Sequence, residues 1–118
     1  MRGLKGIEKK EVIWVEGQSN YSVFHLTNGG KVVLGYTLKL VLEHLGEGFL
    51  RIHKDHIVSV SFIDKVIMPK GVQVPVLILK NKLKLSISRR RSFKFIEDGS
   101  LDQYIIDKSI LQRNKTAV

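Results

Sequence analysis

The chain has 118 residues and no cysteine, and its formal net charge is +9 at pH 7. This is the usual length of one domain, and the lack of cysteine excludes disulfides and thiolate metal sites. No apolar run approaches the roughly 18–20 residues that would span a bilayer. The first six residues lack the apolar segment of a signal peptide, so we expect a cytoplasmic protein with no membrane partner.

The positive charge is concentrated in one block of the chain. Residues 1–48 carry six basic and five acidic groups, residues 49–96 carry eleven and two, and residues 97–118 carry three and four. The net charges of these segments are therefore +1, +9 and −1. Clustered charge of one sign raises the local potential and favours a polyanionic partner. The alternative is that the basic charge only keeps the protein soluble.

The first half of the chain predicts three strands and one helix. Runs of β-branched and aromatic residues predict strands at residues 12–15, 21–27 and 31–34. The polar segment 16–20 is expected to be a turn, and Asn28-Gly-Gly30 is typical of a hairpin turn. A helix is expected between Thr37 as its N-cap and Gly46 just after its end. Its apolar residues have the spacing of one helix face, namely Leu38, Val41, Leu42 and Leu45.

The second half predicts five more strands, at residues 49–53, 57–60, 63–68, 74–79 and 82–87. A turn is expected at residues 69–71 and a hairpin about Lys80-Asn81. In the last strand Leu83, Leu85 and Ile87 alternate with polar residues, which is typical of a sheet with one wet face.

Two further helices are predicted toward the C-terminus. Ser88 is expected to cap a basic helix over residues 89–96 that ends near Gly99. The segment Ser100 to Gln103 resembles a capping box and predicts a last helix to about Arg113. The fold class is therefore mainly β: an antiparallel sheet protein with one central short helix and a C-terminal helical tail. We expect one domain over residues 1–99 and a helical extension over residues 100–118, which packs on the domain or pairs two chains.

The segment 49–58 carries the first candidate site. Arg51, His53 and Lys54 place three hydrogen-bond donors at the end of a strand, which suits contacts with phosphates or base edges. The alternative is that Arg51 is a structural ion-pair partner and that His53 is a hydrogen-bonded framework residue.

A second candidate site is the start of the basic helix, where Arg89, Arg90 and Arg91 crowd the first turn. Positive charge at a helix N-terminus is unfavourable, so a gain elsewhere is expected. Arginines beside free backbone N–H groups suit phosphate binding and can reach guanine in the major groove. A merely solvated basic turn is the alternative.

A third candidate site is Asn20 and Tyr21. Asn20 could bond adenine through two hydrogen bonds, and Tyr21 could reach a phosphate. The alternative is an ordinary turn in which Asn20 has a left-handed conformation.

Enzymatic chemistry is not expected. His53 and His56 suggest a metal site at first sight, but residues three apart in a strand point to opposite faces, and no third ligand lies nearby. The sequence has no glycine-rich phosphate loop or nucleophile elbow. No metal and no cofactor are therefore predicted.

Four segments together resemble the LytTR (LytR/AlgR-type) DNA-binding domain of bacterial regulators. They are residues 12–21, the helix segment 38–45, residues 49–58, and Leu85-Ser-Ile-Ser-Arg-Arg-Arg91, and the resemblance covers roughly residues 5–97. It implies an elongated, mainly β domain of a transcription or response regulator, which inserts loops into successive major grooves of paired repeats in double-stranded DNA.

The resemblance also implies roles for individual residues. The base-contacting positions of the family correspond here to Asn20, Lys54 and Arg90, and their neighbours Tyr21, His53 and Arg89 would contact phosphates. The family usually has a neutral residue where this chain has Asp55 and an asparagine where it has Ser59, which affects the detailed base readout.

The resemblance further implies a homodimer on DNA and a receiver or sensor domain in a longer protein. Two other functions remain open from the residues alone. They are a basic protein-interaction module and an RNA-binding domain.

Overall fold

The computed structural model describes residues 6–68 and 74–105. The chain forms two compact units, which are unit 1 (residues 1–61) and unit 2 (residues 62–118). Within the described ranges there are eight strands, all paired antiparallel in two sheets, and two α-helices. The expected mainly β, antiparallel fold is confirmed. No described helix has the length and apolar character needed to cross a membrane.

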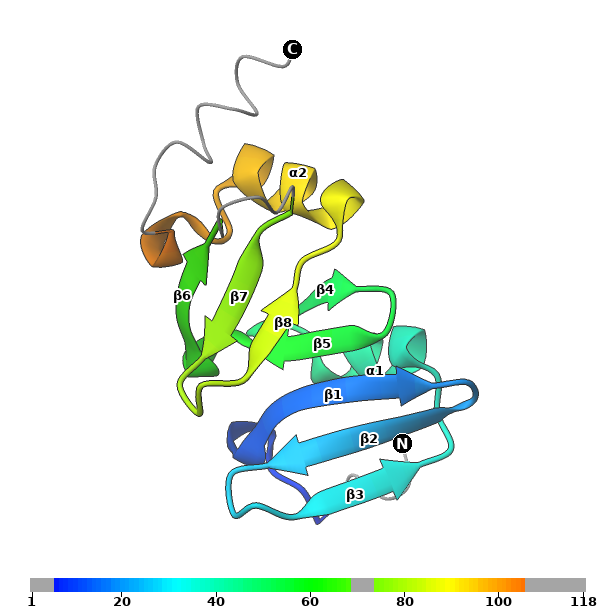
Figure 1. Cartoon of the computed structure of the whole chain (residues 1–118). Helices are drawn as coiled ribbons and strands as arrows, with labels where there is room; N and C mark the ends of the chain where they lie inside the picture. The colour runs from blue at the N-terminus through cyan, green and yellow to red at the C-terminus, as the bar shows by residue number, and fades with distance from the viewer. Residues whose placement is uncertain (1–5, 69–73, 106–118) are drawn as a thin grey trace. The chain divides into compact units, whose positions relative to one another are not determined.

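Unit 1 is a five-stranded sheet with one helix on one face (Figure 1). Its strands lie in the order β3-β2-β1-β5-β4. A short 3₁₀ turn, η1 (Lys9–Glu11), precedes the first strand, and η2 (Val60–Phe62) follows the last one. The strands are β1 (Val12–Gln18), β2 (Tyr21–Leu26), β3 (Lys31–Leu34), β4 (Phe49–His53) and β5 (His56–Ser59).

The first hairpin is tighter than the sequence predicts. Instead of a turn over residues 16–20, β1 continues to Gln18, which pairs with Tyr21, so only Ser19 and Asn20 form the turn. The polar residues Glu16 and Gln18 and the glycine between them do not end the strand, because the ladder with β2 satisfies their backbone groups. The left-handed residue is Ser19, at φ 57°, and not Asn20.

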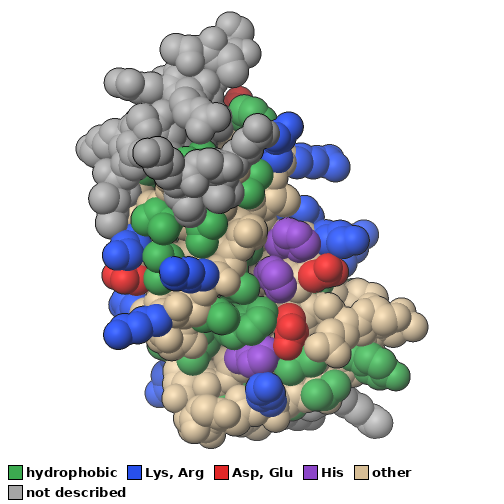
Figure 2. Space-filling view, in the orientation of Figure 1, with side chains coloured by type: hydrophobic (Ala, Val, Ile, Leu, Met, Phe, Trp, Pro, Cys, Tyr) green, Lys and Arg blue, Asp and Glu red, His purple; other side chains and the backbone are tan. Residues whose placement is uncertain are grey.

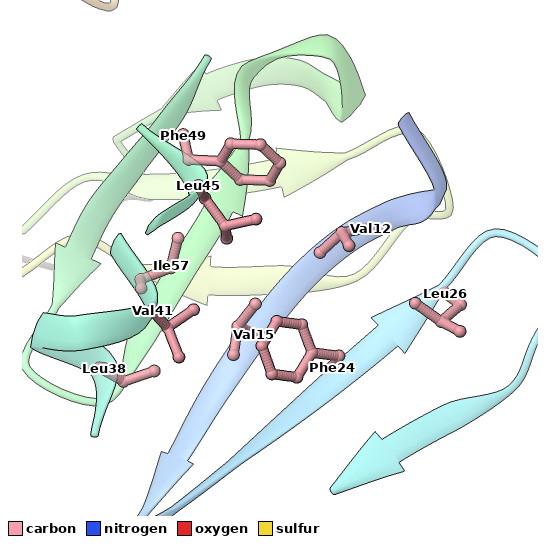
Figure 3. Close-up of a cluster of buried hydrophobic side chains, with 9 residues drawn as sticks. All are labelled: Val12, Val15, Phe24, Leu26, Leu38, Val41, Leu45, Phe49 and Ile57. Atoms are coloured by element: carbon pink, nitrogen blue, oxygen red, sulfur yellow. The ribbon is translucent and has the colours of Figure 1, made fainter. Parts of the chain in front are cut away.

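The helix α1 (Leu38–Leu45) begins and ends where the sequence predicts. The Thr37 hydroxyl accepts a hydrogen bond of 3.4 Å from the backbone N–H of Leu40, and Gly46 ends the helix at φ 67°. The apolar face of α1 packs on the sheet and closes the core of unit 1 (Figure 3). This core consists of Val12, Val15, Phe24, Leu26, Leu38, Val41, Leu45, Phe49 and Ile57.

Close packing of α1 on β1 depends on Gly17. A Cβ atom at this position would lie 2.9 Å from Cγ of Leu38 and 3.0 Å from its Cδ1. A larger side chain would therefore force the Leu38 side chain to move from its place against β1.

Unit 2 contains a three-stranded sheet in the order β6-β7-β8. Its strands are β6 (Ile63–Ile67), β7 (Val76–Leu79) and β8 (Lys84–Ser86). The predicted alternation is confirmed, since Leu85 and Ile87 are buried while Lys84 and Ser86 are exposed. The strand is shorter than the expected 82–87 because Lys82 has φ 71°, which belongs to the turn. The turn predicted at residues 69–71 lies outside the described residues.

The basic helix α2 (Arg89–Asp98) follows β8 and is capped as expected by Ser88 and by Gly99, which has a left-handed conformation. The tail then departs from the prediction. Ser100 donates its hydroxyl to Asp98 instead of opening a helix, and the 3₁₀ turn η3 (Asp102–Tyr104) follows. Short-range bonds to Asp98 compete with the capping box. Leu101 and Ile105 are buried, and Ile105 bridges to Val66 of β6, so this part packs on unit 2. The rest of the predicted helix, to Arg113, lies outside the described residues.

Candidate nucleic-acid interface

The two candidate loops of unit 1 lie next to each other. Glu16, near the end of β1, pairs with His56 at the start of β5. One residue further on, the backbone N–H of Gly17 donates a hydrogen bond of 2.8 Å to the carbonyl oxygen of Asp55. The β1–β2 turn and the β4–β5 turn therefore share one end of the sheet (Figure 1). The sequence had suggested these loops as separate contact points.

The backbone of the β4–β5 turn is held by three hydrogen bonds. The Arg51 guanidinium donates from Nη2 to the carbonyl oxygen of Lys54 over 2.5 Å. The backbone N–H of Asp55 donates to Nδ1 of His53 over 3.2 Å. Together with the bond from Gly17 to the Asp55 carbonyl, these contacts fix the turn, and the Lys54 side chain is exposed from it.

The hydrogen bond at His53 also decides which ring nitrogen can donate. Because Nδ1 accepts from Asp55, a neutral His53 ring carries its hydrogen on Nε2. Nε2 is then a donor that suits a phosphate oxygen. His53 can therefore hold the backbone of the turn through Nδ1 and still offer Nε2 to a phosphate, so the two roles that the sequence suggested for it do not exclude each other.

Arg51 has a structural task in the turn. Its Nη2 atom is committed to the Lys54 carbonyl, and its Nε atom is buried without a hydrogen-bond partner among the described residues. The sequence left open that Arg51 forms a structural ion pair. No ion pair of Arg51 is found within residues 6–68 and 74–105. A direct contact of Arg51 with DNA stays a prediction.

The β1–β2 turn presents its side chains outward. Asn20 is exposed, and Tyr21 is 56% exposed although it is aromatic. Gln18 and Ser19 are exposed beside them. The turn predicted over residues 16–20 contains both of them, but neither was among the expected contact residues. Their position beside Asn20 follows from the two-residue turn, in which Ser19 has a positive φ.

Three histidines and a tryptophan form a strip across the sheet face opposite α1. The rings of Trp14 and His25 stack at 4.2 Å. Trp14 also meets His56 edge to face at 5.6 Å, and His56 lies 5.0 Å from His53. The expectation that His53 and His56 point to opposite faces is therefore wrong. A register shift between Arg51 and His53 sets His53 directly across from His56, which places both on one face.

Acidic side chains accompany this strip (Figure 2). Nε2 of His25 lies 3.0 Å from Oε1 of Glu16. Burial, and then the charge of His53, lower the pKa of His56, while Asp55 and Glu16 act in the opposite direction. No group of three or more potential metal ligands is assembled within residues 6–68 and 74–105.

The candidate site in unit 2 is the first turn of α2. Arg89 and Arg90 are exposed, while Arg91 is half-buried. The Ser88 hydroxyl accepts from the backbone N–H of Arg91 over 3.4 Å, and the Ser92 hydroxyl donates to the Arg89 carbonyl over 2.8 Å. No acidic residue stands in this turn to offset the arginines. The helix N-terminus and the guanidinium groups together suit an anionic ligand.

Unit 2 carries further exposed cations. The β7–β8 hairpin carries Lys80, Lys82 and Lys84, and α2 carries Lys94, all of them exposed. Such a surface raises the local concentration of a polyanion and speeds its association.

A family model of the LytTr DNA-binding domain matches residues 3–98. The chain belongs to the LytTR family of DNA-binding domains. This is a family of DNA-binding domains and not of enzymes. The matched range includes all three candidate sites, namely the β1–β2 turn, the β4–β5 turn and the first turn of α2.

The LytTR fold is also found in a solved structure from Bacillus cereus. It is the LytTr DNA-binding domain of a protein assigned as a methyl-accepting/DNA response regulator. The two share 18% sequence identity with a TM-score of 0.68, over 77% of this chain and 83% of that one. At this identity the likeness shows the fold alone. None of the curated proteins matched the chain.

Proposed function

We propose that this LytTR domain is a sequence-specific double-stranded DNA-binding module of a transcriptional regulator. The observation that carries the proposal is the hydrogen bond between Gly17 and Asp55. It holds two turns side by side, with Asn20 and Lys54 exposed on them. Two adjacent turns with exposed polar tips can enter one major groove together, where each base pair has a distinct pattern of donors and acceptors.

The chemistry of the exposed groups suggests their roles. Arg90 and Lys54 would donate to O6 and N7 of guanine, and Asn20 would form two hydrogen bonds with adenine. Tyr21, His53 and Arg89 would contact phosphates and set the register on the duplex. Arg51 and Arg91 would support the turn and helix that carry these groups.

The decisive experiment begins with selection of bound duplexes from a random pool. The affinity of Arg90→Ala and Arg90→Lys for the selected duplex and for random DNA is then measured by fluorescence anisotropy. Loss of a two-point guanine contact should weaken specific binding by about 1–3 kcal/mol and relax the preference at one base pair. Arg90→Lys keeps the charge, so it should lose specificity but retain more of the non-specific affinity. An equal loss for all sequences would make Arg90 a phosphate contact.

Lys54 has a matched control at the other end of the sheet of unit 1. Lys31 is an exposed lysine at the start of β3, where it pairs with His25, so Lys31→Ala removes the same charge away from the two proposed contact turns. With about six to eight phosphates neutralised, affinity of the unaltered protein should fall steeply with salt. Lys54→Ala should weaken binding to the selected duplex by about 1–3 kcal/mol, and more than binding to random DNA, whereas Lys31→Ala should not. A flat salt response of the unaltered protein would contradict the proposal, as would equal binding to RNA of matched sequence.

The assembly on DNA follows from the family resemblance as a second part of the proposal. The domain would bind paired repeats as a homodimer, under control of a receiver or sensor domain in a longer protein. The Bacillus cereus relative of the same fold comes from a response regulator. The spacing of half-sites in the selected duplexes and the stoichiometry of the complex test this, since a single half-site bound by one chain would contradict it.

A further inference from the structure

An aromatic side chain is exposed on the basic helix of unit 2. Phe93 is 46% exposed, whereas Phe95 on the same helix is 6% exposed. Ser92 and Phe95 form the buried face of α2, and Phe93 belongs to the outer face. Phe93 therefore contributes little to the core of unit 2.

The neighbours of Phe93 on this outer face are mostly cations. Arg90 and Arg89 precede it by three and four residues, so they lie one helical turn away on the same side. Lys94 follows directly, and Glu97 lies one turn further on. All four are exposed. The exposed phenyl ring of Phe93 is thus surrounded mostly by positively charged side chains. Such a surface fits an anionic partner that also offers an apolar group.

Duplex DNA offers such a group in its major groove. The C5-methyl of thymine is the apolar feature there, and phenylalanine is one of the side chains that contact it. Side chains three residues apart on a helix are about 5–6 Å apart. Successive bases on a strand are about 3.4 Å apart. A helix that places Arg90 on a guanine would therefore place Phe93 one or two base-pair steps away.

We propose that Phe93 contacts the methyl group of a thymine one or two steps from the base that Arg90 contacts, and that it makes this thymine part of the recognised sequence. The inference rests on the proposed function, because it needs α2 to enter the major groove. A second copy of the chain is a poor occupant of this face, since pairing would bring like charges from Arg89, Arg90 and Lys94 together.

The test replaces each thymidine of the selected duplex, one at a time, by deoxyuridine, which removes only the methyl group. Affinities of the unaltered protein and of Phe93→Ala are measured for every duplex. Burial of one methyl group is worth about 0.8 kcal/mol, which corresponds to about a fourfold change in affinity. At one position the unaltered protein should lose about this factor, and Phe93→Ala should be nearly indifferent to the replacement.

A control variant separates this effect from a general loss of apolar surface. Leu40 is 47% exposed on α1 of unit 1, so Leu40→Ala removes a side chain of similar exposure from a different helix. It should show the same sensitivity to deoxyuridine as the unaltered protein. Thermal unfolding of each variant checks that α2 remains folded.

Several results would overturn the inference. An equal deoxyuridine effect in the unaltered protein and in Phe93→Ala would show that another residue meets the methyl group. A uniform loss of affinity without such coupling would make Phe93 a structural or backbone contact. Both results leave specific DNA binding intact. If the random pool yields no preferred duplex at all, the proposed function fails and the inference fails with it.

Discussion

The backbone N–H of Gly17 donates a hydrogen bond of 2.8 Å to the carbonyl oxygen of Asp55. This bond joins two turns that are 38 positions apart in the chain. Asp55 is also one of the two positions, with Ser59, at which the family resemblance implies a departure from the usual residue. Its backbone holds the turns together, while its side chain belongs to the residue that directly follows the exposed Lys54. The backbone role does not depend on the side chain, so the two can be tested separately.

Gly17→Ala should destabilise unit 1 by about 1–3 kcal/mol, because the new Cβ forces Leu38 out of its place in the core. The chain has one tryptophan, and it is Trp14 on β1, so urea unfolding followed by its fluorescence reports on unit 1. Gly35→Ala is the matched control, since nothing lies within 4 Å of a Cβ at that position. Equal stability of the two variants would contradict close packing at Gly17.

Arg51→Ala should weaken DNA binding through the position of Lys54. The Arg51 guanidinium holds the Lys54 carbonyl, so its loss frees the turn. A double-mutant cycle with Lys54→Ala should give a coupling energy of about 1 kcal/mol, and the double variant should bind little worse than Lys54→Ala alone. If the two effects add, Arg51 contacts DNA on its own.

Asp55→Asn should strengthen binding to all duplexes at low salt. A carboxylate near phosphate costs about 1 kcal/mol through like-charge repulsion, so a gain of about fivefold is expected. Glu43→Gln removes an exposed carboxylate from α1 and should change affinity far less. The opposite result is also informative. A loss restricted to duplexes with cytosine at one position would show that the carboxylate accepts a hydrogen bond from cytosine N4.

The stability of unit 1 should fall as the pH decreases below about 6.5 because of His56. Burial and the charge of His53 lower the pKa of His56 in the folded state below its ordinary value of 6.5. The unfolded chain then binds the proton more readily, and stability is lost as the pH falls from 6.5 toward the folded pKa. In His56→Gln this contribution is absent.

The measurement for His56 compares urea unfolding of unit 1 at about pH 7.5 and about pH 5.5. The loss of stability between the two conditions should be smaller in His56→Gln than in the unaltered protein. His44→Gln serves as the control, because His44 is exposed on α1. If His56→Gln and the unaltered protein lose the same stability between the two pH values, protonation of His56 does not contribute to the pH dependence of folding.

Features that depend on neighbouring residues were determined by the sequence itself. Thr37 and Gly46 set the ends of α1 because capping bonds reach only a few residues along the chain. Ser88 and Gly99 do the same for α2. The alternation around Leu85 predicted which side of β8 is buried, since successive side chains in a strand point to opposite faces. The family resemblance could also be recognised from four such local segments.

Features that depend on pairing between distant residues were decided only by the tertiary structure. The ladder with β2 extended β1 through the polar residues before Ser19, which the local pattern had assigned to a turn. The shifted register of β4 and β5 brought His53 and His56 to one face. The position of Gly17 beside Asp55 follows from the pairing of β1 with β5. Local periodicity specifies which residues form a strand, but which strands pair, and in which register, depends on hydrogen bonds and core packing between distant segments.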